Sequence, residues 1–421
     1  MDFKKVEDFT AFTDLSRRCY PGMKLNTREE QERYTEHRRK MAQKDDIHTI
    51  GLYEKEQLVG GYIAYDHVMN VYGQQVKAGG IGTVAVDLPY KKQGHAKRII
   101  QQFLAEARDK GQIIAHLYPF QPSFYKRMGF GLGPRLSTYH FHPSQLPTYD
   151  GGEKVEVLNA DDQDEVKACY DTWAEDNHGA TAIPTYGFAF LEKEELHTFG
   201  VREEGKLTGY VTLEFKEGDH FLQNDLHVKS FFHTSTKAYR SLIRYLHNQK
   251  DQVRSIYFPT FDQEFAYSLN DPVHVDEQLI FSIYHKVSEE GRGLMYRILD
   301  IPAFLEKIGE VCFGTDTVRV GWKVKDSFLN ETHESVWQFT NGKPQPTGEE
   351  AEVTIEIDIA NFSSLMMGCV SLSSLLRSGA AVSEGRAVDL FQHPEQPNAG
   401  HFSNRNHTYI TCRSRCGEME R

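Results

Sequence analysis

A hairpin-like segment occurs twice in this sequence, and the copies are separated by about the length of one domain. Residues 48–66 read HTIGLYEKEQLVGGYIAYD, and residues 197–215 read HTFGVREEGKLTGYVTLEF. Six residues recur in register without a gap: His48, Thr49, Gly51, Glu54, Leu58 and Gly60 match His197, Thr198, Gly200, Glu203, Leu207 and Gly209. Each copy has a short apolar run, a charged turn and a second run rich in β-forming residues, which predicts a β-hairpin. A repeat at this distance indicates two copies of one α/β unit, and 421 residues suffice for two or three domains.

The segment after the first hairpin has the pattern of a strand, a turn and a helix. Residues 79–87 (GGIGTVAVD) predict a buried strand, and residues 88–94 (LPYKKQG) form a basic turn that contains a glycine. Apolar residues then recur every three or four positions up to Gly111, which is the pattern of an amphipathic helix ending at a glycine. In the second copy the matching turn, residues 233–238 (HTSTKA), has no glycine, although the helical pattern after it persists.

This arrangement is suited to binding phosphate. The first amides of a helix have no partner within the helix and lie at the positive end of its dipole. A glycine lets the backbone approach a pyrophosphate closely, and lysines add positive charge. We therefore expect the first unit to hold a phosphate-bearing cofactor, and the second unit to keep the scaffold without the site.

Two motifs in the first unit resemble signatures of the GNAT acetyltransferases. Residues 84–96 (VAVDLPYKKQGHA) resemble the acetyl-CoA motif of that family, usually written Q/R-x-x-G-x-G/A. Lys91 departs from the first position of that motif, whereas Gly94 and Ala96 fit it. Residues 123–130 (SFYKRMGF) resemble the second signature, a tyrosine followed by a glycine and an aromatic residue. One helix and one strand are expected between the two motifs, and together the motifs are a specific signal.

Over nearly its whole length the chain is similar to the enhanced-intracellular-survival (Eis) branch of that superfamily. Those proteins join an active GNAT domain, a degenerate second one and a C-terminal domain that resembles sterol carrier proteins. In the final region, residues 353–359 alternate like a half-buried strand, and residues 362–368 and 372–376 have the pattern of short apolar helices. The resemblance implies a mixed α/β (α+β) fold with three domains: a catalytic GNAT domain over residues 1–150, a degenerate one over 151–288 and a sterol-carrier-protein-like domain over 289–421.

The same resemblance implies acetyl-CoA as co-substrate and gives roles to the residues that match the family motifs. The backbone of Val84, Ala85 and Val86 is expected to pair with the pantetheine arm, where an amide can stabilise negative charge on the thioester oxygen. Phe120 and Gln121 are expected to touch the cofactor as well. The pyrophosphate is expected on a run of six residues: Lys92, Gln93, Gly94, His95, Ala96 and Lys97.

Tyr125 matches the general acid of the family, which protonates the departing CoA thiolate. A phenol with a pKa of about 10 can protonate a thiolate whose conjugate pKa is about 8.5 when the two are in contact. The alternative is that Tyr125 is a core aromatic residue that packs on Phe130. In the family the terminal carboxylate is the general base, which would be that of Arg421, but this tail is longer and more basic than expected. An internal carboxylate or a bound water is the alternative base.

Composition limits the partners. The chain has 60 acidic and 48 basic residues and a net charge of -12, which disfavours nucleic acid and favours cationic small molecules, although solubility alone also explains it. Neither a run of 18 apolar residues nor an apolar N-terminal segment is present, so no membrane span or signal peptide is expected. Six scattered cysteines suit a reducing compartment, and a cytoplasmic location is expected. No metal is expected, because His401, His407, Cys412 and Cys416 match no common zinc spacing.

Three functions are compatible with these features. The first is acetyl-CoA-dependent N-acetylation of a cationic small molecule that resembles an aminoglycoside or a polyamine. The second is acetylation of lysine side chains on proteins, which uses the same chemistry but needs a wider acceptor groove. In the third, the C-terminal domain carries an apolar ligand in a tunnel lined by Leu365, Met366 and Leu375. The resemblance also implies a homo-oligomer, with a hexamer as the family analogy.

Overall fold

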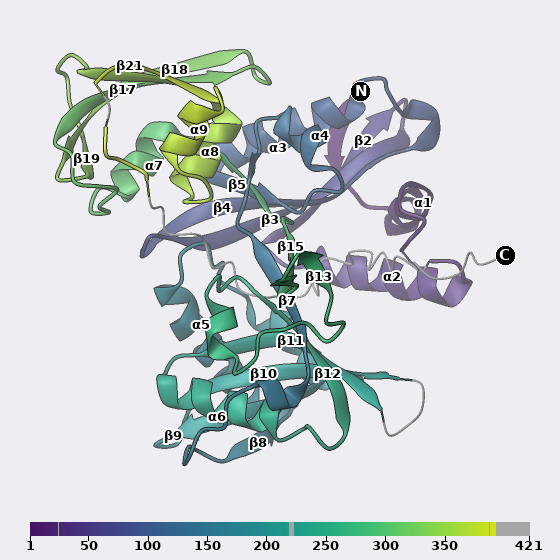
Figure 1. The fold of residues 1–421 in the computed structure, drawn as a ribbon. Coiled ribbons are helices and arrows are strands. Elements are labelled where there is room, and N and C mark those ends of the chain that lie inside the picture. The colour runs from purple at the N-terminus through teal and green to yellow at the C-terminus, as the bar shows by residue number, and fades with distance from the viewer. Residues whose placement is uncertain (24, 219–222, 387, 393–421) are drawn as a thin grey trace.

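The computed structural model describes residues 1–421 except residue 24, residues 219–222, residue 387 and residues 393–421. Its described residues contain two seven-stranded sheets and one five-stranded sheet, and each sheet with its helices forms one unit (Figure 1). The first and third units lie together at the top of Figure 1, and the second unit lies below them. Two similar α/β units followed by a third confirm the predicted mixed α/β fold.

The first sheet contains the first predicted hairpin and the strand after it. β2 (Ile47–Glu54) and β3 (Gln57–Val71) form the hairpin, and β4 (Gln74–Val86) contains the predicted buried strand. The strand order is β1-β2-β3-β4-β5-β16-β6. The remaining strands are β1 (Asp2–Lys5), β5 (Ile114–Leu117), β6 (Gly131–Leu132) and β16 (Met295–Ile298).

Helices cover both faces of the first sheet, because residues on its central strands are apolar on both sides. Tyr62 on β3 lies in the apolar cluster covered by α3 (His95–Asp109), whereas the next residue, Ile63, packs with α1 (Phe9–Cys19). The predicted amphipathic helix is therefore α3, and its apolar stripe faces the sheet. The other helical segments of this unit are α2 (Arg28–Met41), the 3₁₀ turn η1 (Leu88–Tyr90) and α4 (Pro122–Lys126).

The second sheet repeats this plan with the strand order β15-β7-β12-β11-β10-β9-β8. β9 (His197–Glu203) and β10 (Lys206–Glu217) form the second predicted hairpin, followed by β11 (Asn224–His233). Leu242, Ile243 and Leu246 of α6 (Thr236–His247) are buried against this sheet, as their spacing predicts. The other elements are β7 (Leu136–Phe141), β8 (Val155–Leu158), α5 (Gln163–Asp176), β12 (Val253–Thr260), β15 (Ser288–Gly291) and the 3₁₀ turns η2 (Pro143–Gln145), η3 (Ala160–Asp162), η4 (Thr185–Glu192) and η5 (Phe265–Ser268).

Each of these sheets takes one strand from a distant part of the sequence. β7 lies within residues 1–150 but pairs antiparallel with β12 of the second sheet. β16 lies within residues 289–421 but pairs antiparallel with β5 of the first sheet. Strands β7 and β16 are thus each exchanged into the sheet of another unit, and the boundaries 1–150, 151–288 and 289–421 stay predictions.

The third sheet has the strand order β19-β18-β17-β20-β21. β20 (Val353–Asp358), α8 (Ile359–Met366) and α9 (Leu372–Arg377) lie where the sequence predicts one strand and two short helices. The other elements are α7 (Ile301–Lys307), β17 (Val318–Asp326), β18 (Glu331–Thr340), β19 (Lys343–Pro346) and β21 (Ala381–Gly385), with a separate hairpin of β13 (Leu279–Phe281) and β14 (Tyr284–His285) before them. The likeness of this unit to sterol carrier proteins stays a prediction.

The turn between β3 and β4 contacts both other units. The ring of Tyr72 stacks on His178 of the second unit with a centroid distance of 3.8 Å. Its hydroxyl donates a hydrogen bond to the Met366 carbonyl of the third unit at 3.0 Å. The Asn70 amide nitrogen donates to the Ala174 carbonyl at the end of α5 at 2.9 Å. This turn therefore fixes the first unit relative to the other two.

Candidate active site

The two central parallel strands of the first sheet separate after a short paired stretch. β4 and β5 pair only from Ala78 opposite Ile114 to Gly80 opposite His116, although β4 continues to Val86. Near the point of separation the register of β4 against β3 shifts, and Thr83 has a φ of 48°, in the left-handed region. A bulge with this geometry ends regular pairing and re-aims the backbone. The result is a strand edge that faces a gap in the sheet.

Val84 and Val86 turn their backbone polar groups toward this gap. The Asp87 amide donates to the Val59 carbonyl on β3 at 2.9 Å, so the antiparallel alternation directs Ala85 toward β3 and its two neighbours away from it. The side chains after α1 confirm that direction, because the Tyr20 hydroxyl donates to the Val84 carbonyl at 2.6 Å. The Cys19 thiol donates to the Val86 carbonyl in the same way, at 3.2 Å. Of the three residues predicted to pair with pantetheine, the structure thus directs Val84 and Val86 away from β3 and Ala85 toward it.

The N-terminus of α3 is open to an incoming anion. Gly94 precedes the helix with a φ of 82°, and no side chain caps the first turn. Lys92 also has a left-handed backbone, with a φ of 63°, and the side chains of Lys92 and Gln93 are exposed. Alternation of left-handed and ordinary backbone makes a concave row of amides that binds anions. This geometry fits the predicted pyrophosphate site.

The side chains on the first turn of α3 do not point to that site. His95 is buried beside Tyr90, with ring centroids 6.1 Å apart. The Lys97 ammonium lies 5.7 Å from the ring centroid of Phe328 in the third unit. His95, Ala96 and Lys97 thus offer their backbone amides, while positive charge in the loop comes from Lys91 and Lys92.

Arg18 and Asp87 anchor the start of the loop, and sequence reasoning missed both. The Arg18 guanidinium donates to both Asp87 carboxylate oxygens at 3.0 and 2.8 Å, and the Leu88 amide donates to the same carboxylate at 2.8 Å. The hydrogen bond from Arg18 is the main reason that the pKa of Asp87 lies below its usual value. The signal in the sequence was an acidic residue at the end of a predicted strand, since Asp87 is the last residue of the segment 79–87, but its partner Arg18 is distant in the chain.

Tyr125 lies on α4, which begins at Pro122 directly after Gln121. The residue is buried, and its ring makes edge contacts with Phe120 and Phe130 at centroid distances of 5.5 and 6.2 Å. Burial raises the pKa of its phenol well above the usual value, so the group keeps its proton. Phe120 is 64% exposed, and Gln121 is exposed beside it. Tyr125 both packs on Phe130, as the alternative reading expected, and holds a proton, as the general acid requires.

A histidine pair lies beside the point where β4 and β5 separate, and no pattern in the sequence singled it out. His67 Nδ1 lies 2.9 Å from His116 Nε2, and the two rings stack. The carbon Cε1 of His67 would be 3.1 Å from a Cβ added at Gly80, so this glycine leaves room for the ring. Burial lowers the pKa of His67 to about 4, and the ring is neutral at neutral pH.

The second unit keeps the strand geometry and lacks the phosphate loop. His233 on β11 lies opposite Gly209, as Val86 on β4 lies opposite Gly60. Residues 87–94 separate β4 from α3, whereas only Thr234 and Ser235 separate β11 from α6. The Ser235 hydroxyl accepts a hydrogen bond from the Ala238 amide at 3.0 Å, which caps α6, and Glu203 bonds to that hydroxyl. A capped helix with a carboxylate at its N-terminus disfavours phosphate.

Some predicted residues lie outside the described part of the chain. They are Arg421 and the four residues His401, His407, Cys412 and Cys416. Among the residues that the structure does describe, no group of three or more His, Cys, Asp or Glu side chains is placed to hold a metal ion.

Comparison with known proteins relates both similar units to one family. Two family models match, each described as an acetyltransferase (GNAT) domain, over residues 4–133 and 160–298. No curated protein matches the sequence. Eis1 from Mycobacterium abscessus has a similar structure, with a TM-score of 0.74 at 19% identity over 95% of this chain and 99% of that one. A GCN5-related N-acetyltransferase from Anabaena variabilis has a TM-score of 0.72 at 16% identity, over 95% of this chain and 97% of that one. A probable N-acyltransferase from Enterococcus faecalis has a TM-score of 0.74 at 19% identity, over 94% of this chain and 99% of that one.

Proposed function

This chain is a GNAT acetyltransferase with an Eis-like fold, and we propose that it transfers the acetyl group of acetyl-CoA to an amine of a cationic small molecule. The observation that carries the proposal is the difference between its two similar units. In the first unit, a strand edge faces a gap and leads through a lysine-bearing loop to an uncapped helix. In the second unit, the corresponding helix is capped and the loop is reduced to two residues, Thr234 and Ser235. One acetyl-CoA site per chain follows from this difference.

Different residues of the first unit bind different parts of acetyl-CoA. The co-substrate supplies a thioester that an amine can attack. The amides at the start of α3 and the charge of Lys92 hold the pyrophosphate. The edge formed by Val84 and Val86 pairs with the pantetheine arm like an added strand. One amide of that edge donates to the thioester carbonyl oxygen as negative charge grows on it, an effect worth about 2.7–4 kcal/mol. Phe120, whose ring contacts that of Tyr125, and the exposed Gln121 are assigned the remaining contacts with the cofactor.

Tyr125 is the general acid in this proposal. As the amine nitrogen bonds to the acetyl carbon, the carbon–sulfur bond breaks and the thiolate takes the phenolic proton. The raised pKa of Tyr125 keeps that proton in place until the thiolate forms. The amine loses its own proton to a base, and solvent returns a proton to Tyr125 after CoA leaves.

The terminal carboxylate of Arg421 is the general base that the family resemblance proposes. The His67–His116 pair is the internal alternative, because it lies beside the point where β4 separates from β5. Both groups are weak bases, with usual pKa values near or below neutrality. The ammonium group first releases one proton to solvent, which gives the free amine that attacks. A weak base is sufficient for the second proton, since the nitrogen becomes strongly acidic once its bond to the acetyl carbon forms.

We propose the class of acceptor amine from the net charge of the protein. The net charge of -12 attracts polyamines and aminoglycosides through the field of the whole protein. A lysine side chain on a protein is the second candidate, because it presents the same amine. The test is release of free CoA thiol from acetyl-CoA with a panel of polyamines, aminoglycosides and lysine peptides, each against a carboxylate-rich amine of similar size. Turnover confined to the peptides would favour the second candidate, and no turnover with any amine would contradict the proposal.

An apolar-ligand function for the third unit has less support. Leu365, Met366 and Leu375 are buried in the core that this unit shares with the ends of β3 and β4. Side chains that fill a shared core stabilise the contact between two units. We therefore propose that the third unit supports the first and, through the tail beyond the described residues, supplies the terminal carboxylate.

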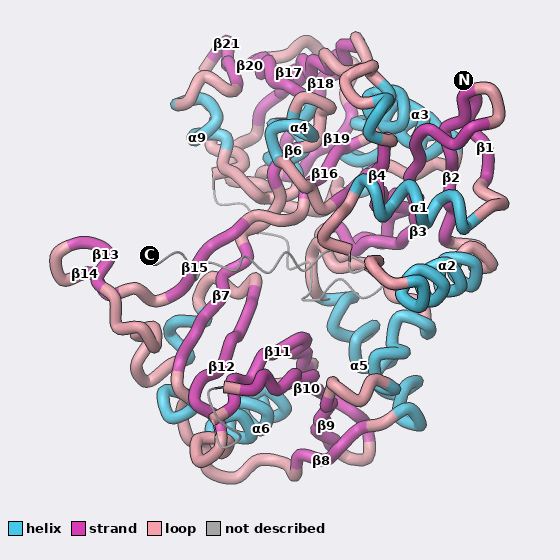
Figure 2. Tube along the Cα trace, turned by 90° about the vertical axis from the view of Figure 1, so that its right-hand side faces the viewer, coloured by secondary structure: helices cyan, strands magenta, loops and turns pink. Residues whose placement is uncertain are grey.

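We further propose that copies of this chain associate through the β13–β14 hairpin. Figure 2 shows this hairpin projecting from the second unit. Five large apolar side chains on it are more than half exposed: Leu279, Ile280, Phe281, Ile283 and Tyr284. An exposed apolar patch of this kind commonly marks an association surface. Light scattering on Phe281→Asp tests the proposal, and an unchanged mass would contradict it.

Location is proposed on two observations. The four cysteines in the described ranges, Cys19, Cys169, Cys312 and Cys369, are all free. No helix within those ranges is long and apolar enough to cross a membrane. Together with the use of acetyl-CoA, the free thiols favour the reducing conditions of the cytoplasm.

A further inference from the structure

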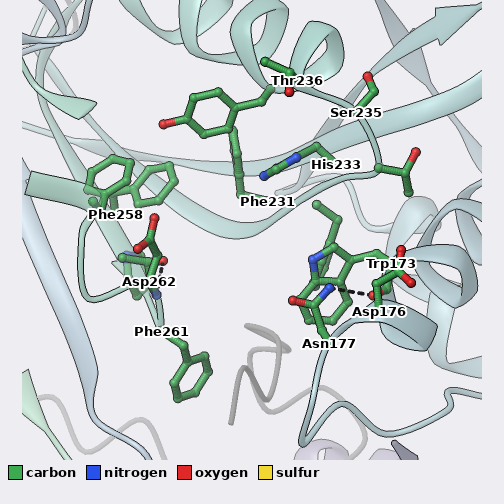
Figure 3. A pocket seen from close by; sticks show the side chains of 16 residues that line it. Trp173, Asp176, Asn177, Phe231, His233, Ser235, Thr236, Phe258, Phe261 and Asp262 are labelled. Carbon is green, nitrogen blue, oxygen red and sulfur yellow. Dashed lines mark hydrogen bonds between the residues drawn. The ribbon is translucent and has the colours of Figure 1, made fainter. Parts of the chain in front are cut away.

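The second unit contains a cavity at the place where the first unit has its cofactor gap. β11 and β12 pair in parallel as far as His227 opposite Tyr257, and both strands then continue apart. A pocket of about 450 Å³ lies between their ends (Figure 3). Small-molecule sites in proteins typically span about 300–1,000 Å³. The strand separation that serves acetyl-CoA in the first unit thus leaves a ligand-sized pocket in the second.

The charge of this pocket excludes a phosphate-bearing ligand. Its described lining contains two carboxylates, Asp176 and Asp262, and no lysine or arginine. Figure 3 shows Asp176 on one side of the pocket and Asp262 on the other. The helix at its rim is capped by Ser235, which also bonds to Glu203. The carboxylates of Asp176, Asp262 and Glu203 repel an anion and attract a cation.

The walls of the pocket are aromatic. The Phe231 ring on β11 contacts the Phe258 ring on β12 across the gap, with centroids 5.2 Å apart. Trp173, at the end of α5, packs edge-on against Phe232 at 4.7 Å. Tyr239 of α6 lies 5.8 Å from Phe231. Aromatic faces attract organic cations through the ring quadrupole, most strongly when the cation carries alkyl groups and is weakly hydrated.

We propose that this pocket is a second, non-catalytic binding site that takes an organic ammonium ion. The carboxylates of Asp176 and Asp262 compensate its charge at the rim, and the aromatic side chains contact its alkyl groups. The site is built entirely from the second unit, so the proposal stands whether or not the first unit transfers acetyl groups. It also explains why the strands of the second unit remain separated although the phosphate loop is gone.

The probe for the test is choline, compared with 3,3-dimethylbutan-1-ol, its neutral isostere of the same shape. Choline cannot be acetylated on its quaternary nitrogen, so its binding is measured separately from catalysis. Binding is followed by calorimetry and by tryptophan fluorescence. Trp322 and Trp337 are buried in the third unit, so a fluorescence change reports on Trp173. We expect one saturable choline site per chain and at least fivefold weaker binding of the isostere.

The pocket variant carries both Asp176→Asn and Asp262→Asn, and the matched control carries both Asp164→Asn and Asp251→Asn. Both pairs remove two negative charges from exposed positions of the second unit, but only the first pair lines the pocket. The Glu264 amide donates to Asp262 Oδ1 at 2.8 Å, and asparagine keeps that acceptor. We expect roughly two- to fivefold weaker choline binding for each pocket carboxylate removed and no change in the control.

Two results would overturn the proposal. Equal binding of choline and its isostere would make the pocket an apolar site without charge selection. Undiminished choline binding in the pocket variant, with its melting temperature equal to that of the control, would place the cation elsewhere. Acetyl-CoA turnover of the pocket variant gives a separate readout, and we expect it to be unchanged.

Discussion

Arg18 and Asp87 form a two-point ion pair that attaches the start of the cofactor loop to helix α1. The Asp87 side chain is nearly buried, whereas that of Arg18 is 38% exposed. The pair lies between the strand edge and the lysines of the loop, so it sets the direction in which the loop leaves the sheet.

Asp87→Asn should raise the KM for acetyl-CoA about three- to tenfold without lowering kcat, because the loop loses its anchor while Tyr125 stays in place. Asp14→Asn is the matched control, since Asp14 pairs with Arg17 on the exposed side of the same helix. Steady-state kinetics at saturating amine measures both variants. An unchanged KM in Asp87→Asn would make the pair irrelevant to cofactor binding.

The same ion pair predicts a pH dependence of stability. The pKa of Asp87 lies below its unfolded value of about 3.9, because Arg18 hydrogen-bonds to its charged form. Its stabilisation is therefore fully present above that value and is lost as the pH falls through the lower folded pKa. Urea unfolding should show Asp87→Asn to be less stable by about 1 kcal/mol from pH 5 to 7, with Arg18 partly screened by solvent. The difference should shrink below pH 4, and a difference that persisted there would contradict the assignment.

Gly94→Val should raise the KM for acetyl-CoA at least tenfold. Gly94 and Gly111 precede and follow α3, both have left-handed backbones, and no atom lies within 4 Å of a Cβ added at either. At either position the left-handed backbone strains a valine by about 1–2 kcal/mol, so Gly111→Val is a matched control for stability. Only Gly94 lies where a pyrophosphate must approach. Equal KM values for the two variants would remove this loop from the site.

Tyr125→Phe should lower kcat by about 10²–10⁴-fold with little change in acetyl-CoA affinity, because phenylalanine keeps the packing and lacks the proton. Tyr62→Phe is the control, since Tyr62 is also buried in the same core and its hydroxyl binds Glu106 at 2.9 Å, away from the gap. Because burial raises the pKa of Tyr125, the wild-type rate should not fall from loss of this proton between pH 8 and 10. Full activity of the Phe variant would leave Tyr125 as a packing residue.

Calorimetric titration with CoA should give one site per chain. The capped α6 and the carboxylate of Glu203 leave the second unit without a place for the pyrophosphate. Gly94→Val should weaken that single site. Two sites, or one site that Gly94→Val leaves unaffected, would show that the second unit binds the cofactor after all.

The terminal base is tested by amidating Arg421 through semisynthesis, which removes the carboxylate and leaves every side chain in place. If that carboxylate takes the amine proton, turnover should fall by about 10²-fold or more. Deleting residues 412–421 should abolish turnover for the same reason. Full activity of the amidated protein would exclude Arg421, and His67→Gln would then test the histidine pair.

The sequence by itself determined the repeated hairpins, the strand before Gly94 and the helix after it. These features follow from local periodicity and from glycine and proline positions, which act over a few residues whatever the rest of the chain does. It also indicated that the second unit lacks the phosphate loop, because the matching turn at residues 233–238 has no glycine.

Only the tertiary structure decided which groups face the gap. The alternation set by Asp87 opposite Val59 turned Val84 and Val86 outward and Ala85 inward, and a shift of one residue would have reversed this. Arg18 with Asp87, His67 with His116 and the aromatic pocket of the second unit join residues that are far apart in the sequence. The tertiary structure also decided the pairing of the exchanged strands β7 and β16. Pairing between distant segments depends on how the whole chain packs and leaves no local pattern.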